Sequence, residues 1–368
     1  MIYLDNGATS FHKPETVYRA MRCALDNCAN PGRGGYPAAM AAAKTVLRCR
    51  ERAGSLFHCQ PEQVVMTSNC THGLNIAINT LVKPGSKVVI SGFEHNAVTR
   101  PLRARKAEIT VTGRKLFCWE DTLQAFEDAL KKGADAAVFT HVSNVFGYIL
   151  PVYEMAALCC QYSVPFVIDA AQSAGMLPID LQKLGADFIA MPGHKGLLGP
   201  QGTGLLLSGR EPVPLLQGGT GSLSVSQEMP DFLPDVAEAG TLNVPGIAGL
   251  SAGLAYVLEQ TPARILEREC REAQRCANTL EKLGFRVFAG EHQSGTVSFV
   301  PNMDCEEAAR LLAEQGIGVR AGLHCAPLAH ESAGTLDTGT VRISFGHDAA
   351  PWQTGMLTQE AEKLTRQS

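Results

Sequence analysis

Short apolar runs alternate with helix-like stretches from about residue 62 to residue 210. The apolar runs predict strands at 63–67, 87–90, 108–111, 135–140, 165–169, 187–190 and 204–207. The pattern between them predicts helices, including one that begins at Gly73 and one over 152–162. Apolar strands joined by helical crossovers indicate a mainly parallel sheet covered on both faces. Such a sheet binds its ligand at the carboxyl ends of its strands.

The pattern changes after residue 210. Glycine and proline are frequent over 211–245, which predicts a surface loop. From about residue 262 the pattern is that of an α+β unit. It predicts helices at 263–283, 305–315 and 351–366, and strands at 285–287, 296–300, 341–345 and near Val319.

Composition narrows the class of protein. The chain has 368 residues, 45% of them hydrophobic, which is enough for a large core and about two domains. The net charge is −4 with both signs mixed, so we expect no nucleic-acid or membrane partner and a small-molecule substrate instead. No apolar run reaches the roughly 20 residues that span a bilayer, and the first residues do not resemble a signal peptide. These features predict a soluble, cytoplasmic protein.

Twelve cysteines are scattered along the chain without a C-x-x-C pair. A zinc site or a disulfide framework would need tighter clustering, so neither is predicted. Several cysteines lie in helix-like stretches, where a free cysteine usually acts as a small buried apolar residue.

Two motifs follow neighbouring predicted strands. Asp169 ends the apolar run Val167-Ile168-Asp169, and Gln172 comes three residues later. A carboxylate in this place raises the pKa of a protonated ring nitrogen, although an N-cap role for Asp169 is the ordinary alternative. Lys195 lies one strand later in a glycine-rich turn and can form a Schiff base with an aldehyde, whereas an isolated lysine is usually a surface charge. Together the two residues point to pyridoxal 5'-phosphate, whose ring nitrogen needs such a partner.

Two further segments lie after predicted strands. The segment Thr67-Ser68-Asn69-Cys70-Thr71-His72-Gly73 precedes a helix, and its hydroxyls and free amides suit the cofactor's phosphate, although ordinary N-capping fits equally. His95 follows the strand at 87–90 and can stack on a flat ring, but an isolated histidine is more often structural.

A last cluster lies near the C-terminus. Cys325 has histidine neighbours in sequence and Arg320 nearby, and cationic groups favour the nucleophilic thiolate. Arg342 offers a planar fork for an amino acid's carboxylate. Most of the twelve cysteines are expected to be inert; the polar surroundings of Cys325 set it apart.

The combination resembles the class V aminotransferase group of fold-type I pyridoxal-phosphate enzymes, and within it the cysteine desulfurase and selenocysteine lyase family. The resemblance covers nearly the whole chain, from Tyr3-Leu4-Asp5-Asn6-Gly7-Ala8-Thr9 to the last helix. The segment from Arg320 to Pro327 resembles the second group of desulfurases, in which the nucleophile follows an R-x-G-x-H pattern. Pro192 stands where the family commonly has a serine, and His72 where it commonly has an acidic residue.

The resemblance implies an α/β fold in three parts. A large cofactor-binding domain over 16–255 contains a mainly parallel seven-stranded sheet. A smaller α+β domain covers 256–368, and an N-terminal segment over 1–15 packs with the smaller domain.

The resemblance also implies the roles of the site residues. Lys195 binds the cofactor, Asp169 pairs with its ring nitrogen, Gln172 contacts its phenolic oxygen and His95 stacks on its ring. The remaining expected cofactor contacts are Cys70, Thr71, His194, Asn144 and, from the partner subunit of a homodimer, Thr241. The substrate contacts are Arg342, Asn144 and Arg320.

The implied reaction is that of a cysteine desulfurase. Lys195 acts as general base at the substrate's Cα, and Cys325 attacks the sulfur of L-cysteine, giving L-alanine and a persulfide for a sulfur-acceptor protein. A selenocysteine lyase acting on L-selenocysteine would have the same site. An aminotransferase or another lyase with this cofactor, and a non-catalytic protein on the same scaffold, remain alternatives.

Overall fold

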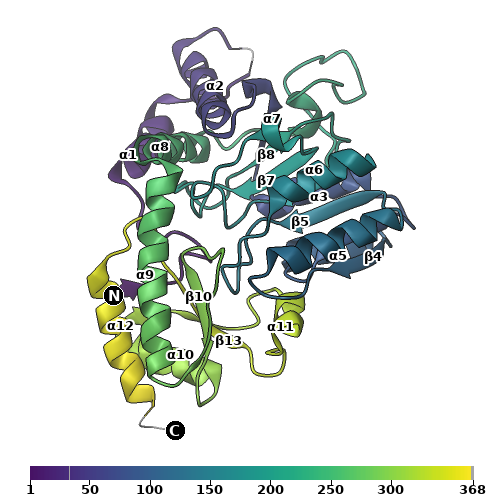
Figure 1. Ribbon diagram of the computed structural model, residues 1–368. Coiled ribbons are helices and arrows are strands. Elements are labelled where there is room, and N and C mark those ends of the chain that lie inside the picture. Colours follow the sequence, from purple (N-terminus) through teal and green to yellow (C-terminus); the bar gives the residue numbers. More distant parts are fainter. Residues whose placement is uncertain (33, 366–368) are drawn as a thin grey trace.

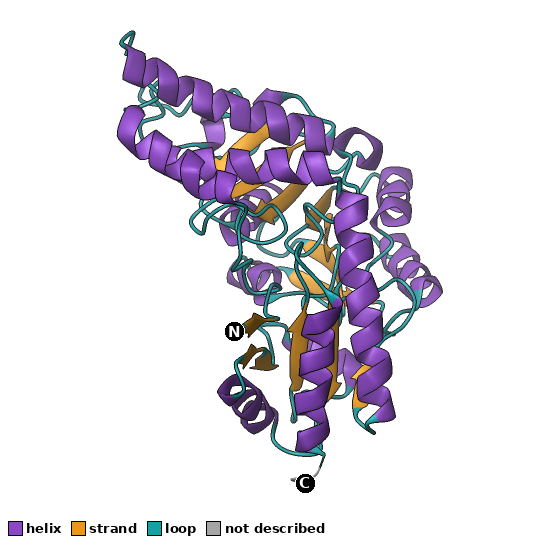
Figure 2. Ribbon diagram, turned by 90° about the vertical axis from the view of Figure 1, so that its left-hand side faces the viewer, coloured by secondary structure: helices purple, strands orange, loops and turns teal. Residues whose placement is uncertain are grey.

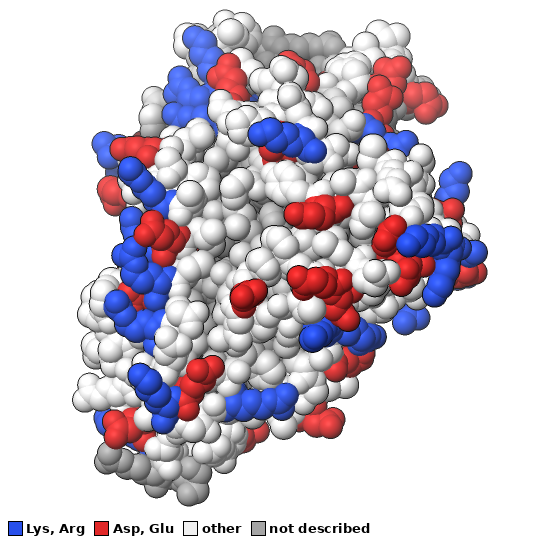
Figure 3. All heavy atoms as spheres, viewed as in Figure 1, with Lys and Arg blue, Asp and Glu red and all other residues white. Residues whose placement is uncertain are grey.

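The computed structural model describes residues 1–32 and 34–365 (Figure 1). A large sheet with helices on both faces occupies one half of the molecule. A smaller sheet, flanked by long C-terminal helices, occupies the other half. No helix in the described ranges is both long and apolar enough to cross a membrane. Basic and acidic side chains are interspersed over the face shown in Figure 3.

The large sheet has seven strands in the order β2-β8-β7-β6-β5-β3-β4. Strand β8 is antiparallel to both of its neighbours, and the other pairs are parallel. This confirms the predicted mainly parallel sheet. The strands are β2 (Val64–Thr67), β3 (Lys87–Ser91), β4 (Glu108–Thr112), β5 (Ala136–Thr140), β6 (Phe166–Asp169), β7 (Phe188–Pro192) and β8 (Gly204–Ser208).

Alternate residues of these strands enter two different apolar cores. In β5, Ala137 and Phe139 pack on one face of the sheet, while Ala136 and Val138 pack on the other. A strand buried on both faces has few polar positions, which explains the continuous apolar runs in the sequence.

Helices of the large unit cover both faces and one end of the sheet. Helices α1, α2 and α8 pack together at that end, where Figure 2 shows them as long neighbouring helices. The helices are α1 (Glu15–Asn27), α2 (Pro37–Phe57), α3 (Cys70–Leu81), α4 (Asn96–Ala104), α5 (Trp119–Lys131), α6 (Val152–Tyr162), α7 (Leu181–Leu184) and α8 (Val244–Gln260), with 3-10 turns at Pro61–Gln63 and Asp235–Ala237.

The C-terminal unit is built on an antiparallel sheet in the order β12-β13-β10-β9. Helices α9 and α12 lie side by side against it (Figures 1 and 2). Its elements are α9 (Pro262–Lys282), β9 (Arg286–Phe288), β10 (Thr296–Val300), α10 (Cys305–Glu314), β11 (Ile317–Gly318), β12 (Arg320–Gly322), α11 (Pro327–Ala333), β13 (Thr340–Ser344) and α12 (Pro351–Leu364). The predicted end of the last helix at residue 366 lies outside the described residues.

The N-terminal segment lies against the C-terminal unit. Strand β1 (Ile2–Tyr3) pairs in parallel with β11, and Ile2 and Leu4 belong to the apolar core of that unit. The predicted division at residue 256 falls inside α8, which ends at Gln260. We propose Thr261, which separates α8 from α9, as the place where the second unit begins.

Two local predictions differ from the structure. The helix expected to begin at Gly73 begins at Cys70, because the side chain of Asn69 caps it by accepting a hydrogen bond from the backbone N–H of His72 (2.9 Å). The strand expected near Val319 is divided at that residue, since β11 pairs with β1 and β12 pairs with β13.

Candidate active site

A cavity of about 110 Å³ lies at the carboxyl ends of the parallel strands. Thr140, Asp169 and Pro192, which end β5, β6 and β7, all line it. This is the edge at which the sheet was expected to bind a ligand. The predicted site residues in its lining are Cys70, Thr71, His95, Asn144, Asp169, Gln172, His194 and Lys195.

Asp169 is buried at the end of β6, with 2% of its surface exposed. Its Oδ1 accepts hydrogen bonds from the backbone N–H of Ala171 (2.9 Å) and from the Sγ of Cys70 (3.4 Å). Burial, together with the Asp169 charge, raises the pKa of the Cys70 thiol well above its usual value. Cys70 therefore stays protonated and donates to the carboxylate.

Lys195 lies in a tight turn between β7 and β8. A side chain at Gly196 would meet the carbonyl oxygen of Ala174 at 2.4 Å, so the turn packs closely on the chain that follows Asp169. Burial lowers the pKa of the Lys195 amine, and the Asp169 carboxylate opposes this effect.

The N-terminal segment covers part of the site. Gln172 donates from Nε2 to the carbonyl oxygen of Gly7 (2.9 Å). The carbonyl oxygen of His194 accepts from the backbone N–H of Ser10 (2.9 Å), and the Nδ1 of His194 lies 3.0 Å from the hydroxyl of Thr9. Burial lowers the pKa of His194 to about 4, so its ring is neutral at physiological pH.

His95 caps helix α4. Its Nδ1 accepts from the backbone N–H of Ala97 (3.0 Å), which leaves the proton of the neutral ring on Nε2. Burial lowers the pKa of His95 and favours that neutral form. The turn before it is held by Glu94, whose carboxyl group accepts from the backbone N–H of Thr140 (2.9 Å) and from the hydroxyl of Ser91. Burial raises the pKa of Glu94 to about 8.

The N-terminus of α3 borders the cavity. Thr71, a predicted phosphate contact, is exposed and lines it. His72 lines a different cavity, and its Nδ1 accepts from the backbone N–H of Ser68 (3.3 Å). His72, which stands where the family commonly has an acidic residue, therefore does not line the 110 Å³ cavity that contains Lys195.

Cys325 is exposed on a loop beside the cavity rather than in its lining. The carbonyl oxygen of Cys325 accepts from the backbone N–H of Asn96 (2.7 Å), and that of His324 accepts from Nδ2 of Asn144 (2.7 Å). Both His324 (φ 52°) and Cys325 (φ 56°) adopt the left-handed conformation. Two anchors therefore hold a tightly turned loop next to the residues that follow His95.

Arg342 lies on β13 with 2% of its surface exposed. Its Nη1 donates to the carbonyl oxygen of Asn144 (2.9 Å), and its Nη2 donates to Oδ1 of Asp5 (2.6 Å). The other oxygen of Asp5 accepts from Nε of Arg320 (3.1 Å), which is exposed. The Oδ1 of Asn144 and the Nε of Arg342 are buried without a hydrogen-bond partner in the described chain. Polar groups in this state suit a polar ligand.

A family model matches this architecture. The model for aminotransferase class-V covers residues 2–351. The chain belongs to this family.

Similar proteins support the assignment along the whole chain. A protein of Methanothermobacter thermautotrophicus named probable cysteine desulfurase is 32% identical over 99% of this chain and 94% of its own length. A probable cysteine desulfurase of Pyrococcus abyssi is 33% identical over 94% of this chain and 89% of its own length. The solved cysteine desulfurase of Thermococcus onnurineus has a TM-score of 0.91 and 30% identity, over 100% of this chain and 95% of that one.

Thr241 does not line the 110 Å³ cavity that contains Lys195. It is exposed and lines two other cavities, one of which also contains Ser68 and His72. Neither of these cavities shares a lining residue with the Lys195 cavity. A contact between Thr241 and the cofactor of its own chain has no support in this geometry.

Sequence reasoning missed Asp5 and Glu94, and it counted the histidines near Cys325 among the cationic groups that favour a thiolate, whereas both are buried. The rings of His324 and His330 are stacked at 5.8 Å, and burial lowers their pKa values to about 3 and about 4. The motif Tyr3-Leu4-Asp5 marked a resemblance but assigned Asp5 no role. Asp5 and Glu94 are found through their contacts with the distant residues Arg342 and Thr140, which a single sequence does not display.

Proposed function

We propose that the chain is a cysteine desulfurase that uses pyridoxal 5'-phosphate to remove sulfur from L-cysteine, giving L-alanine and a persulfide on Cys325. The observation that carries the proposal is the meeting of Lys195 and Asp169 in one cavity, with the Cys325 loop held beside it by the bond from Asn144 to the carbonyl oxygen of His324. The names of the similar proteins support the same activity.

The residues present fit the cofactor. The cavity offers a lysine for its aldehyde, a buried carboxylate for its ring nitrogen, and the N-terminus of α3 for its phosphate. Thr71 and His194 are the proposed phosphate contacts, and Cys70 and Gln172 lie beside Asp169 in the same lining. When bound, the cofactor supplies an electron sink that makes the substrate's Cα–H acidic.

The protein's own groups have defined tasks in this proposal. The lowered pKa of Lys195 suits an amine that takes and returns a proton at the substrate's Cα. His95 presents a neutral ring whose Nε2 carries a proton. Arg342 and Asn144 bind the carboxylate of the substrate, with Arg320 at the exposed side.

Sulfur transfer balances without an external oxidant. The thiolate of Cys325 attacks the substrate's sulfur, so an S–S bond forms while the substrate's Cβ–S bond breaks. The substrate's Cβ gains one proton and becomes the methyl group of alanine. This gain balances the proton that Cys325 lost when its thiolate formed. An acceptor protein or a small thiol then takes the outer sulfur, and the exposure of Cys325 allows its approach.

We propose a homodimer in which Thr241 reaches the phosphate site of the partner subunit. Thr241 is exposed and remote from its own cavity, and the segment before it exposes several apolar side chains. These are Val213, Leu216, Leu223, Val225 and Phe232. A contiguous exposed apolar patch marks an interface, and we propose that these side chains contribute to one at the dimer contact.

The cytoplasm is the proposed compartment. Every one of the cysteines is free of disulfide bonds in the structure, and Cys23, Cys160 and Cys325 are exposed. A reducing environment keeps such thiols available.

Release of alanine from L-cysteine by the cofactor-loaded protein tests the function. We expect Lys195→Ala to lose both the visible absorbance of the bound cofactor and the reaction, and Cys325→Ala to keep the absorbance but lose alanine release. L-selenocysteine serves as the competing substrate, and an added 2-oxo acid reveals an aminotransferase. Alanine and sulfide released by Cys325→Ala at the wild-type rate would rule out the persulfide route.

A further inference from the structure

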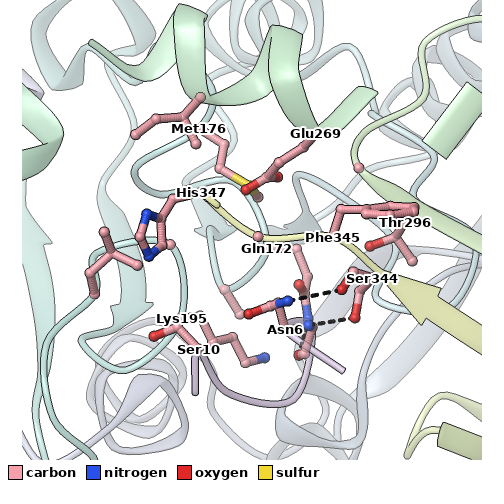
Figure 4. A pocket seen from close by; sticks show the side chains of 17 residues that line it. Asn6, Ser10, Gln172, Met176, Lys195, Glu269, Thr296, Ser344, Phe345 and His347 are labelled. Atoms are coloured by element: carbon pink, nitrogen blue, oxygen red, sulfur yellow. Dashed lines mark hydrogen bonds between the residues drawn. The ribbon is translucent and has the colours of Figure 1, made fainter. Parts of the chain in front are cut away.

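A second, smaller cavity lies behind Lys195. It has a volume of about 30 Å³ and is bounded by the N-terminal segment, by α9 and by the chain after β13. Lys195, Gln172 and Ala171 line both this cavity and the larger one, so they form the wall between the two. In Figure 4, Glu269 extends from α9 toward Met176, while Lys195 and Gln172 lie across the cavity from it.

Glu269 is the unusual member of the lining. Only 3% of its surface is exposed, and within residues 1–32 and 34–365 its carboxyl group makes no hydrogen bond or ion pair, while its oxygens are not fully enclosed by protein atoms and line the cavity. Buried polar groups in folded proteins almost always have a partner. Burial raises its pKa well above the usual value and therefore favours the protonated, neutral form of the carboxyl group.

The charged groups around Glu269 act on its pKa in opposite directions. Asp348, beyond β13, raises its pKa further, whereas Arg268 on α9 lowers it. Lys195 and His347 are the other titratable side chains in the lining. None of these groups forms an ion pair with Glu269 in the described chain.

The size of the cavity determines what it can hold. A water molecule needs about 10–15 Å³ of cavity volume. The cavity of about 30 Å³ therefore has room for about two waters and none for an amino acid. Asn6, Ser10, Thr296 and Ser344 add polar groups to the lining, which such waters need as partners. Water in this space would link the carboxyl group of Glu269 to the side of Lys195 that faces away from the substrate.

We propose that Glu269 exchanges protons with the Lys195 amine through water held in this cavity. This proposal rests on the proposed function, in which Lys195 takes a proton from the substrate's Cα and one proton must reach Cβ. The Glu269 carboxyl group gives its proton to the water chain, and the chain passes one to Lys195. The carboxylate then recovers a proton from solvent, equal to the one that Cys325 loses as its thiolate forms. Glu269 is thus a proton-supplying residue that acts through Lys195.

Exchange of the α-proton of L-alanine in D₂O tests the proposal, because it needs Lys195 but no sulfur transfer. We expect Glu269→Gln to slow deuterium uptake at least about tenfold at equal cofactor loading. Glu269→Asp keeps a carboxyl group and should retain more exchange than Glu269→Gln. A packing role predicts the reverse order, since glutamine has the size of glutamate and aspartate is shorter. The matched control is Glu272→Gln on the same helix, whose carboxylate bonds Thr354 (2.8 Å) and lies outside the cavity.

Infrared spectroscopy gives a readout that is independent of turnover. The spectrum of the wild-type holoenzyme minus that of Glu269→Gln at neutral pH should show a protonated-carboxyl band that shifts in D₂O; the band of Glu94, whose pKa is about 8, is common to both proteins and cancels. The proposal is overturned by the absence of this band from the difference spectrum, by wild-type exchange in Glu269→Gln, or by absence of exchange in the loaded wild type. Normal exchange in a protein that releases no alanine from cysteine would refute the desulfurase function alone.

Discussion

Asp5 joins the two arginines that are proposed to receive the substrate's carboxylate. It accepts from Arg342 at 2.6 Å and from Arg320 at 3.1 Å. A guanidinium group has five N–H donors, so the bonds of Arg342 to Asp5 and Asn144 leave donors for a ligand. A buried arginine without a counter-charge is costly. Asp5 therefore neutralises Arg342 and sets the direction of its fork.

Replacing Asp5 with asparagine tests this orienting role. We expect the KM for L-cysteine to rise about tenfold, which corresponds to about 1.4 kcal/mol, with kcat within about a factor of two. The reason is that binding of the carboxylate, rather than the proton transfer at Lys195, depends on the fork. Asp187→Asn is the control, because Asp187 pairs with exposed Arg210 (3.0 Å) and lines neither cavity beside Lys195. An unchanged KM in Asp5→Asn would show that Asp5 is a structural partner only.

Among single residues, the sequence predicts the neighbours of Lys195 but not the more distant partners Asp5 and Glu269. Asp169 and Lys195 each follow an apolar strand, and parallel strands bring their carboxyl ends to one edge, so the cavity that they share was predictable. Asp5 reaches Arg342 across 337 positions. Glu269 enters its cavity from a helix that reads as an ordinary charged amphipathic segment. Contacts of this range leave no local pattern.

The loop that carries Cys325 is short and contains several residues with positive φ angles. Gly322, at the end of β12, has φ 98°, and His324 and Cys325 follow with positive φ values. Helix α11 begins directly after it, at Pro327, and was not predicted because its seven residues are too few for a clear period. The prediction of a single strand near Val319 was wrong, because the chain forms two short strands there. A break at Val319 lets β11 and β12 join different sheets. The pairing partners of such short strands are set by tertiary packing.

Gly322→Ala should disturb this element by backbone strain alone. An added Cβ at Gly322 would meet no atom within 4 Å, so the cost of about 1 kcal/mol comes from the positive φ. We expect persulfide formation to slow about tenfold or more, with the absorbance of the bound cofactor unchanged. Rapid-quench assays of persulfide and thermal unfolding measure the two effects.

The control for this variant is Gly316→Ala. Gly316 has φ 76° and equally open surroundings, but it lies before β11 and away from Cys325. It should lose similar stability and keep its rate of sulfur transfer. Equal slowing in both variants would argue that general strain, and not the position of Cys325, limits the rate.

The whole molecule combines a large α/β unit with a smaller antiparallel unit, and the N-terminal segment lies between them. Gln172 and His194 of the large unit bond residues 7–10, while residues 2–5 pair with β11 and β13 of the small unit. The α/β class was predictable, because strands buried on both faces give apolar runs of a recognisable length. The docking of the first residues was expected from resemblance alone, since the run Ile2-Tyr3-Leu4 is too short to indicate its partner.

Buried histidines should make the stability of the molecule depend on pH. Burial lowers the pKa of His141 to about 3, whereas the unfolded chain titrates near 6.5. Its stabilising contribution is therefore complete above pH 6.5 and is lost as the pH falls toward 3. From pH 7 to pH 5 this loss amounts to about 2 kcal/mol.

The variant His141→Gln isolates this contribution from those of other buried groups. Glu94, with a pKa of about 8, acts in the opposite direction, because its contribution is lost as the pH rises from 4.5 to 8. The free energy of unfolding of wild type minus His141→Gln, measured by denaturant titration, should fall by about 2 kcal/mol from pH 7 to pH 5. A difference that does not vary with pH would contradict a neutral, buried His141.

The measurement that tests the central claim most directly is a map of sulfur on the twelve cysteines after one turnover. The cofactor-loaded protein is mixed with one equivalent of sulfur-labelled L-cysteine, the thiols are alkylated, and the peptides are identified by mass spectrometry. The account predicts one labelled sulfur on Cys325 for each alanine released. Label on another exposed cysteine such as Cys23 or Cys160, or alanine released with no labelled peptide, would contradict it.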